Sequence, residues 1–171
     1  PRAAPAGPLH VIVFCLYQPR GGIATDVLPS CAPAVHYRAQ FNHHRGSSLK
    51  YISTRGEAPA LDFSDALLAG LARDGGLYVP EVWPQFSSRD IRAMRGQSYQ
   101  EIAFRVISPF VGDEISAIDL RTMIDEAYAT FRHPAVAPLI QTGANSFVLE
   151  LFHGPTLAFK DVAMQLLARL M

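Results

Sequence analysis

The segment from Ser146 to Met171 constrains the fold more than any other part of this 171-residue chain. It opens with a mostly apolar run of strand length, Ser146–Phe152, which leads into a His-Gly-Pro turn. After Lys160, apolar residues recur every four positions from Val162 to Leu170 without a helix breaker. The pattern predicts a buried strand, a loop and a helix, with Lys160 at the point where the loop enters the helix.

Lys160 is one of only two lysines, the other being Lys50, in a chain with 15 lysines and arginines. Arginine therefore fills most positions where a surface cation is needed. In α/β proteins, ligands bind at the end of the sheet where strands lead into helices. The helix dipole and the apolar neighbours Leu157 and Phe159 would favour the neutral amine, whereas the carboxylate of Asp161 would favour the ammonium form. The sequence leaves open which effect is larger.

Three motifs carry a family resemblance: ELFHGPTLAFKD at 150–161, YISTRG at 51–56 and DGGLYVP at 74–80. Over residues 49–171 the chain resembles threonine synthase, a pyridoxal-phosphate enzyme family of the tryptophan-synthase-β-like superfamily. The resemblance implies an α/β fold of the type II pyridoxal-phosphate class, of which this chain would hold the N-terminal portion. In that family the lysine of the HGPT-x-x-FKD motif forms the Schiff base with the cofactor. By position this residue is Lys160, which would be both catalytic and cofactor-binding.

The implied reaction is the last step of threonine biosynthesis, which converts O-phospho-L-homoserine and water to L-threonine and phosphate. Lys160 would hold pyridoxal 5'-phosphate, release it to the substrate amine and then carry protons between substrate carbons. The cofactor would act as the electron sink. The expected partner is a small-molecule substrate and the expected location is the cytoplasm. The glycine-rich loop that holds the cofactor phosphate in this family is not found before Met171, so we expect this stretch alone to be inactive.

Two alternatives remain open on the sequence. Another type II pyridoxal-phosphate enzyme, such as a serine or threonine dehydratase or a sulfhydrylase, would also place a lysine in this loop. A non-catalytic threonine-synthase-like paralogue or binding module could keep Lys160 for packing. His153 could serve as an acid or base, although a histidine that only orders the turn is at least as well supported.

The composition gives no reason to expect nucleic acid or membrane as a partner. The formal net charge is +0, and the front apolar run at Leu9–Tyr17 is too short to cross a bilayer. We expect no metal site, since the His43-His44 pair has no companions at ligand spacing. The two cysteines, Cys15 and Cys31, do not suggest a disulfide framework.

The chain divides by composition into three parts. Residues 1–48 hold four of the six histidines, six prolines and a single acidic residue, without helical or strand periodicity, so we expect a disordered or mistranslated upstream extension. Residues 49–133 are expected to form a mainly helical N-terminal threonine synthase domain. Residues 134–171 would begin the pyridoxal-phosphate domain. Because the sequence starts at Pro1 and stops inside an expected helix, we expect a fragment.

Within residues 49–133 the pattern predicts a strand at 51–54, a helix from Asp62 that ends at Gly75-Gly76, and an extended piece at 77–80. A short helix is expected from Ser88 to Met94. Capping boxes at Ser98-x-x-Glu101 and Ser116-x-x-Asp119 open two further helices. The first should close before Pro109. The second should bury a face made of four apolar residues: Leu120, Ile124, Ala127 and Phe131. Two extended segments are expected next, at 138–142 and 146–152.

Overall fold

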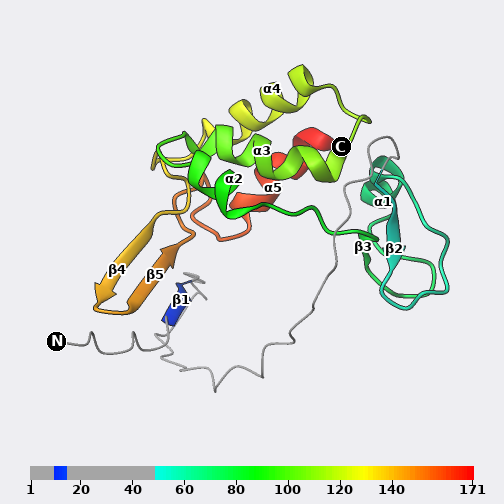
Figure 1. Ribbon diagram of the computed structural model, residues 1–171, viewed down its shortest axis with the longest axis horizontal. Coiled ribbons are helices and arrows are strands. Elements are labelled where there is room, and N and C mark those ends of the chain that lie inside the picture. The colour runs from blue at the N-terminus through cyan, green and yellow to red at the C-terminus, as the bar shows by residue number, and fades with distance from the viewer. Residues whose placement is uncertain (1–9, 15–48) are drawn as a thin grey trace.

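The computed structural model describes residues 10–14 and 49–171 (Figure 1). Over these residues it is a mixed helix and strand structure. The elements are β1 (His10–Phe14), β2 (Tyr51–Ser53), α1 (Phe63–Ala69), β3 (Tyr78–Pro80), α2 (Ser88–Ala93), α3 (Tyr99–Val111), α4 (Ala117–Tyr128), β4 (Leu139–Gly143), β5 (Ser146–Glu150) and α5 (Asp161–Leu170).

Three helices, α3, α4 and α5, form the packed core. The predicted apolar face of α4 is largely confirmed, because Leu120, Ile124 and Ala127 are buried there together with Tyr128. From α5, Leu166 joins the same cluster. Burial of such side chains contributes roughly 1.5–3 kcal/mol each for the larger aliphatic ones. Helix α5, and with it the residue before its first turn, is thus anchored on α4.

Serine caps fix where three helices begin. The side chains of Ser87 and Ser98 each accept a hydrogen bond from the backbone N–H three residues later, and acidic residues at those positions bond back in full capping boxes. Ser116 accepts the equivalent bond from the Asp119 N–H at the start of α4. The predicted start of each of these helices is confirmed to within a residue.

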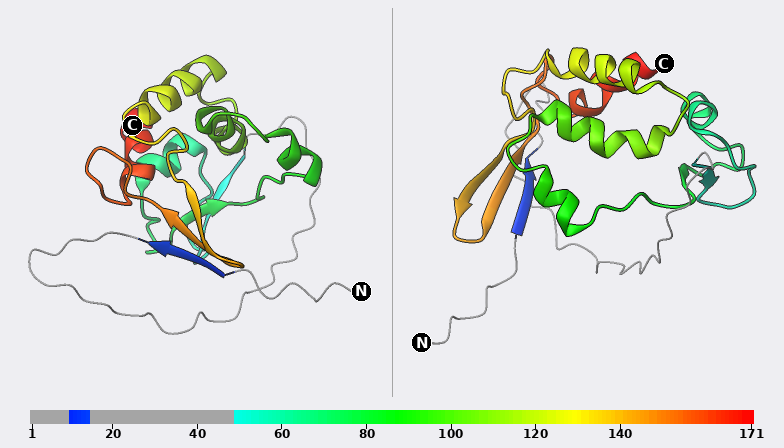
Figure 2. Two further views of the ribbon diagram at one scale, coloured as in Figure 1. Left: turned by 90° about the vertical axis from the view of Figure 1, so that its left-hand side faces the viewer. Right: turned by 45° about the horizontal axis from the view of Figure 1, so that its top comes forward.

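Two small sheets lie apart from the helical core. Strands β2 and β3 pair antiparallel, with Tyr51 opposite Pro80. The other sheet has the order β1-β5-β4, in which β5 lies between a parallel partner, β1, and an antiparallel partner, β4. The β4–β5 hairpin extends from one end of the helical group, whereas α1, β2 and β3 lie at the other end (Figures 1 and 2).

The structure corrects two predicted helix ends. Helix α3 does not close before Pro109 but continues to Val111 with the proline inside it. Proline costs one backbone hydrogen bond there. The extra turn is held by burial of Val111, by a Tyr51 hydroxyl that donates to the Phe110 carbonyl at 2.6 Å, and by the Gly112 N–H, which donates to the Ser108 carbonyl.

Helix α1 ends at Ala69 and not at Gly75-Gly76 as predicted. Gly70 follows with φ +65°, a conformation that glycine adopts readily. Leu71 is 65% exposed and forms an isolated antiparallel bridge with Leu77, so the chain turns back between these two residues. The helix therefore ends before the turn that contains Gly75-Gly76 and does not reach it.

The expectations for residues 1–48 fall almost entirely outside the described residues, including those for Cys15, Cys31 and the His43-His44 pair. Only His10–Phe14 is described, and it forms strand β1 against β5. The sequence did not predict this strand, and the expectation of a disordered or mistranslated extension stays a prediction for the rest of residues 1–48. The edge of β5 supplies the backbone groups with which they pair.

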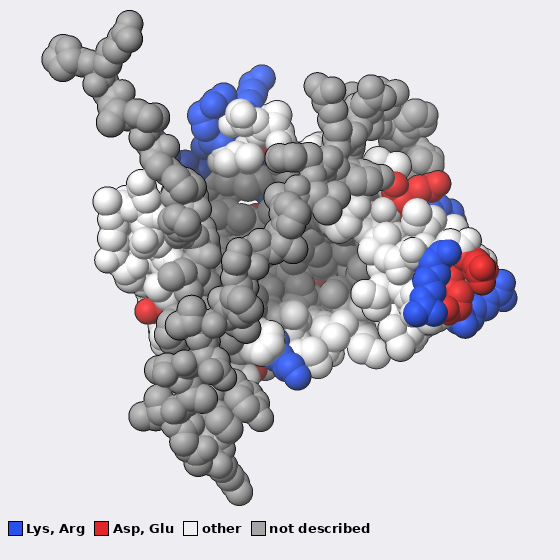
Figure 3. All heavy atoms as spheres, turned by 90° about the horizontal axis from the view of Figure 1, so that it is seen from below, with Lys and Arg blue, Asp and Glu red and all other residues white. Residues whose placement is uncertain are grey.

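Charged side chains of both signs lie on the face seen in Figure 3. Acidic and basic side chains lie beside one another at the right of this view, and a separate group of basic side chains lies at the top. The formal net charge of the chain is +0. Within the described ranges, no helix is long and apolar enough to cross a membrane, and no group of three or more His, Cys, Asp or Glu side chains could hold a metal ion.

Candidate active site

Lys160 lies where the sequence predicts it, at the junction of the loop after β5 and the first turn of α5. It is the N-cap residue of α5, and its side chain is exposed and makes no capping bond. Among the described residues, its amine pairs with no carboxylate and donates no hydrogen bond. The other lysine is different, because the Lys50 amine contacts the carboxylate of Asp62 at 2.7 Å. Lys160 therefore presents an amine that is available for chemistry.

The neighbouring Asp161 is turned into the loop. Its side chain is only 4% exposed, and its two oxygens accept hydrogen bonds from one residue, Thr156. The Thr156 N–H donates to Oδ2 at 2.8 Å, and the Thr156 hydroxyl donates to Oδ1 at 2.8 Å. These two bonds close the loop 154–161 on itself, so that the chain enters α5 in one fixed path.

Gly154 leaves room for this closure. A Cβ atom at this position would overlap the Cβ and the carboxylate of Asp161. Leu157 has φ +62°, and its N–H donates to the Gly154 carbonyl at 3.2 Å. The glycine, the threonine and the aspartate of the HGPT-x-x-FKD motif are thus parts of one structural unit.

The predicted apolar surroundings of Lys160 lie at the surface. Leu157 is 47% exposed and Phe159 is 45% exposed. Neither side chain is covered by the described residues. The loop therefore presents an exposed amine beside two exposed apolar side chains, and this combination is a candidate ligand-binding surface.

His153 links the loop to its surroundings. Its Nε2 atom lies 2.7 Å from a carboxylate oxygen of Glu150, and its backbone carbonyl accepts a hydrogen bond from the Arg132 N–H at 2.9 Å. Its ring packs 4.7 Å from that of Phe152 and 5.0 Å from that of His133, measured between centroids. These contacts favour a histidine that orders the turn, one of the two readings that the sequence left open.

Helix α5 is fixed from the other side by Tyr128. The buried Tyr128 hydroxyl donates to the Val162 carbonyl at 3.1 Å, and burial raises the pKa of this phenol well above its ordinary value. At the opposite end of α5, Arg169 lies 3.4 Å from the carboxylate of Glu126. Both contacts tie the helix that follows Lys160 to α4.

The two N-terminal motifs meet around Asp74. Its carboxylate accepts hydrogen bonds from four donors, which are the Ser53 hydroxyl and the N–H groups of Glu57, Ala58 and Gly76. Desolvation raises the pKa of Asp74, but the four hydrogen bonds outweigh it and hold the pKa below its ordinary value. A Cβ atom at Gly76 would overlap the Ser53 hydroxyl. YISTRG and DGGLYVP are thus two halves of one closed turn.

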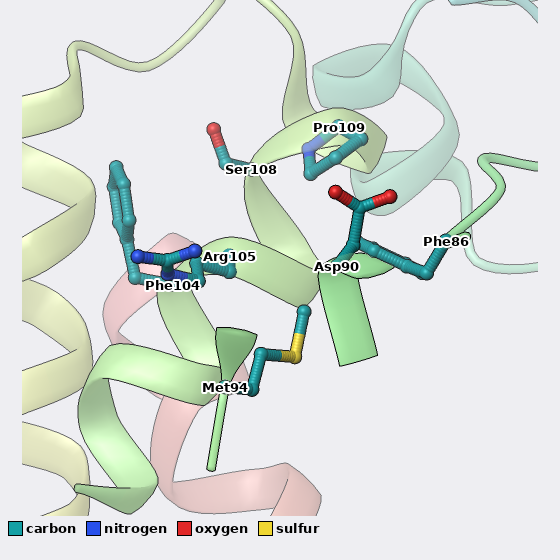
Figure 4. A pocket seen from close by; sticks show the side chains of 7 residues that line it. All are labelled: Phe86, Asp90, Met94, Phe104, Arg105, Ser108 and Pro109. Atoms are coloured by element: carbon teal, nitrogen blue, oxygen red, sulfur yellow. The ribbon is translucent and has the colours of Figure 1, made fainter. Parts of the chain in front are cut away.

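A pocket of about 240 Å³ lies elsewhere, between α2 and α3 (Figure 4). Its lining contains no lysine and no residue of the loop 154–161. The lining residues are Phe86, Asp90, Met94, Phe104, Arg105, Ser108 and Pro109. We therefore place the candidate site at Lys160 and not in this pocket.

Sequence reasoning singled out Lys160 but missed the roles of Gly154, Thr156 and Asp161. It treated Asp161 only as a charge beside the lysine. The spacing Thr-x-x-x-x-Asp across a loop that leads into a helix was the available signal, since a threonine before a helix often bonds to an acid in the first turn.

Comparisons with known proteins agree with this arrangement. Residues 50–128 match the family model described as threonine synthase N terminus. The chain is 58% identical over 123 residues to threonine synthase from Pseudomonas aeruginosa, which covers 72% of this chain and 26% of the relative. It is 37% identical over 124 residues to threonine synthase-like 2 from Xenopus laevis, which covers 72% of this chain and 26% of that protein.

Solved structures give the same result. A pyridoxal-phosphate-bound threonine synthase from Brucella melitensis is 71% identical with a TM-score of 0.71, over 72% of this chain and 27% of that one. The yeast threonine synthase structure is 39% identical with a TM-score of 0.67. That match covers 74% of this chain and 26% of the yeast chain. The family resemblance and the fold class predicted from the motifs are confirmed. The chain spans about a quarter of the length of the relatives it matches.

Proposed function

Because this chain carries the N-terminal region of the threonine synthase family, we propose that the complete protein is a threonine synthase that uses Lys160 as its cofactor lysine. The proposed reaction converts O-phospho-L-homoserine and water to L-threonine and phosphate in the cytoplasm. The observation that carries the proposal is the free amine of Lys160 in a loop whose other motif residues fix its position.

The residues present fit pyridoxal 5'-phosphate. A lysine that binds the cofactor aldehyde needs an accessible, unpaired amine, and Lys160 is exposed and unpaired within the described residues, whereas Lys50 is held by Asp62. When bound, pyridoxal phosphate supplies an electron sink for reactions at the substrate carbons. The Brucella melitensis relative was solved with this cofactor.

The residues of this chain would hold the Lys160 amine in place and transfer protons. Lys160 holds a proton at Nζ and can deliver it to, or accept it from, an adjacent carbon. The Asp161–Thr156 bonds and the Tyr128–Val162 bond keep the backbone beneath that amine in place. Such positioning strongly affects the rate of catalysis, because a reacting group misplaced by about 1 Å can lower the rate roughly 100-fold.

The catalytic site needs more than this chain. Leu157 and Phe159 are about half exposed among the described residues, and the matched segment makes up only 26% of the Pseudomonas aeruginosa relative. We propose that the remaining parts of the site, including the groups that bind the cofactor and substrate phosphates, come from the rest of the protein. The 171-residue chain alone should therefore show no turnover.

The second candidate is the non-catalytic threonine-synthase-like paralogue that the sequence left open, and proteins named threonine synthase-like 2 are among the relatives. The higher identity to the Pseudomonas aeruginosa threonine synthase, 58% against 37%, favours the enzyme. The dehydratase and sulfhydrylase alternatives are not favoured either, because three relatives with 47–58% identity bear the name threonine synthase.

The direct test is an assay of the complete protein with O-phospho-L-homoserine and added pyridoxal phosphate. Threonine and phosphate should form in equal amounts, and Lys160→Ala should abolish both. Lys50→Ala is the matched control and should retain turnover. Formation of an oxo acid from serine or threonine, without threonine synthesis, would support the dehydratase alternative. A protein that makes no product and binds no cofactor would support the non-catalytic one.

A further inference from the structure

We propose that Thr156 is a positioning residue that holds the carboxylate of Asp161 away from the amine of Lys160. The inference deepens the proposed function and depends on it, because it concerns the ability of Lys160 to react with the cofactor aldehyde. It explains why a lysine that should react as a neutral amine is followed directly by an aspartate.

The hydrogen bonds of Asp161 are the first observation. A carboxylate that lies close to a lysine amine favours the ammonium form of that amine. Both Asp161 oxygens instead accept from Thr156, at 2.8 Å from its N–H and 2.8 Å from its hydroxyl. No contact within 4.0 Å joins Lys160 to a carboxylate among the described residues. The aspartate is therefore occupied by the loop.

Burial is the second observation. Asp161 is 4% exposed although its neighbour Lys160 lies at the surface. The carboxylate packs on the backbone of Gly154 so closely that no Cβ atom would fit there. A buried carboxylate is costly unless its oxygens are hydrogen-bonded, and the Thr156 bonds meet this need. Loss of the Thr156 hydroxyl would leave Oδ1 without a donor and favour rotation of the side chain toward Lys160.

The other titratable groups near this end of α5 each have a partner of their own. They lie on α4, on β5, in the loop after β5 and on the chain between α4 and β4. Tyr128 donates to Val162, His153 contacts Glu150, and His133 accepts from the Ala135 N–H. The Glu126–Arg169 pair lies at the opposite end of α5. Arg132, whose N–H donates to the His153 carbonyl, is a cation and would not favour the ammonium form of a neighbouring amine. Asp161 is the carboxylate next to Lys160 in the chain, and its release from Thr156 is the change that we expect to act on the amine.

The consequence is a dependence on pH. Only the neutral amine attacks an aldehyde, and a carboxylate paired with the amine favours the ammonium form. With Thr156 in place, adduct formation should reach half its maximal rate at a lower pH than it would with a free Asp161. Removing the hydroxyl should shift the profile toward higher pH.

The experiment follows the rate at which the complete apoprotein binds added pyridoxal phosphate covalently, as a function of pH. Absorption of the bound cofactor gives the rate, and borohydride reduction with peptide mass spectrometry gives the labelled residue. Thr156→Val should raise the pH midpoint by about 1 unit, and Thr156→Ser should restore the original midpoint. Thr122→Val, at an exposed threonine on α4 that bonds only to the Ile118 carbonyl, is the matched control and should leave the midpoint unchanged.

A double variant assigns the cause. If Asp161 produces the shift, then Thr156→Val combined with Asp161→Asn should show no upward shift. Thr156 is exposed, so its variants should fold, and Thr156→Ala serves as a second test of the same bond. An unchanged midpoint in both Thr156 variants, or a shift that persists in the double variant, would overturn the inference. A wild-type label on a lysine other than Lys160 would instead overturn the proposed function.

Discussion

Two aspartates, Asp74 and Asp161, hold the loops in which the three motifs lie. Asp74 accepts four hydrogen bonds and Asp161 accepts two, and each packs beside a glycine that has no room for a side chain. The sequence could show that these residues stand in motifs, but it could not show their partners. Ser53 and Asp74 are 21 residues apart, and only the folded chain brings them to 2.8 Å.

Asp74 makes stability depend on pH in acid. Its pKa in the folded protein lies below its ordinary value of 3.8, so it contributes stability that is fully present above 3.8 and is lost as the pH falls through the folded-state pKa. We expect Asp74→Asn to lower the thermal midpoint at neutral pH, because an amide N–H would face the donors of Glu57 and Ala58. Thermal unfolding of the complete protein at a series of pH values measures this.

The gap in thermal midpoint between wild type and Asp74→Asn should be constant at neutral pH. It should narrow as the pH falls from 3.8 through the lower folded-state pKa of Asp74, because the carboxyl of the unfolded chain binds a proton before that of the folded protein. Asp65→Asn, at an exposed position in the first turn of α1, is the matched control. A gap that stays the same down to acid pH would show that the Asp74 hydrogen bonds do not depend on its charge.

The helices show which helix ends can be predicted from residues that are close in the sequence. Ser98 and Ser116 predicted helix starts because a serine cap and an acid three residues later act within one turn. The end of α3 beyond Pro109 could not be predicted, since it depends on Tyr51, which is 59 residues from its bonding partner Phe110. The start of α1 was predicted at Asp62, but the capping groups come from elsewhere.

Helix α1 is capped by Glu114, from the connection between α3 and α4. Its carboxylate accepts hydrogen bonds from the N–H groups of Phe63, at 2.6 Å, and Ser64, at 2.9 Å, while Asp62 makes no side-chain capping bond. We expect Glu114→Ala to destabilise the complete protein by about 1 kcal/mol, as for the loss of other helix caps. Hydrogen exchange of the α1 amides should become faster.

Glu81→Ala, at an exposed position outside the helices, is the control for Glu114→Ala and should leave exchange in α1 unchanged. If Asp62→Ala accelerated exchange in α1 more than Glu114→Ala did, the N-cap aspartate and not the distant glutamate would be the effective cap.

At the scale of the whole molecule, the motifs were enough to identify the family, because three segments spread over residues 51–161 resemble it together. The family model itself matches residues 50–128, which contain the first two motifs. The pairing of β1 with β5 could not be predicted. It joins residues 10–14 to residues 146–150 in parallel, and such a pairing depends on contacts between distant parts of the chain. The limits of the three domains stay a prediction.

Residues 1–48 should be dispensable for the enzyme. We expect a complete protein that begins with a methionine in place of Leu49 to match the longer form in cofactor content, thermal midpoint and turnover, since the motifs and the packed core all lie after that residue. A loss of more than about 1 kcal/mol on deletion would contradict this and would point to the β1–β5 pairing as a contribution to stability.

Lys160 carries the cofactor in the proposed enzyme, and the position of the reduced adduct is the sharpest test of this role. The complete protein is loaded with pyridoxal phosphate, reduced with borohydride, digested and sequenced by mass spectrometry. We expect a phosphopyridoxyl group on the peptide that contains Lys160, and none in Lys160→Ala. An adduct on Lys50, or on a lysine outside this chain while Lys160 stays unmodified, would contradict it.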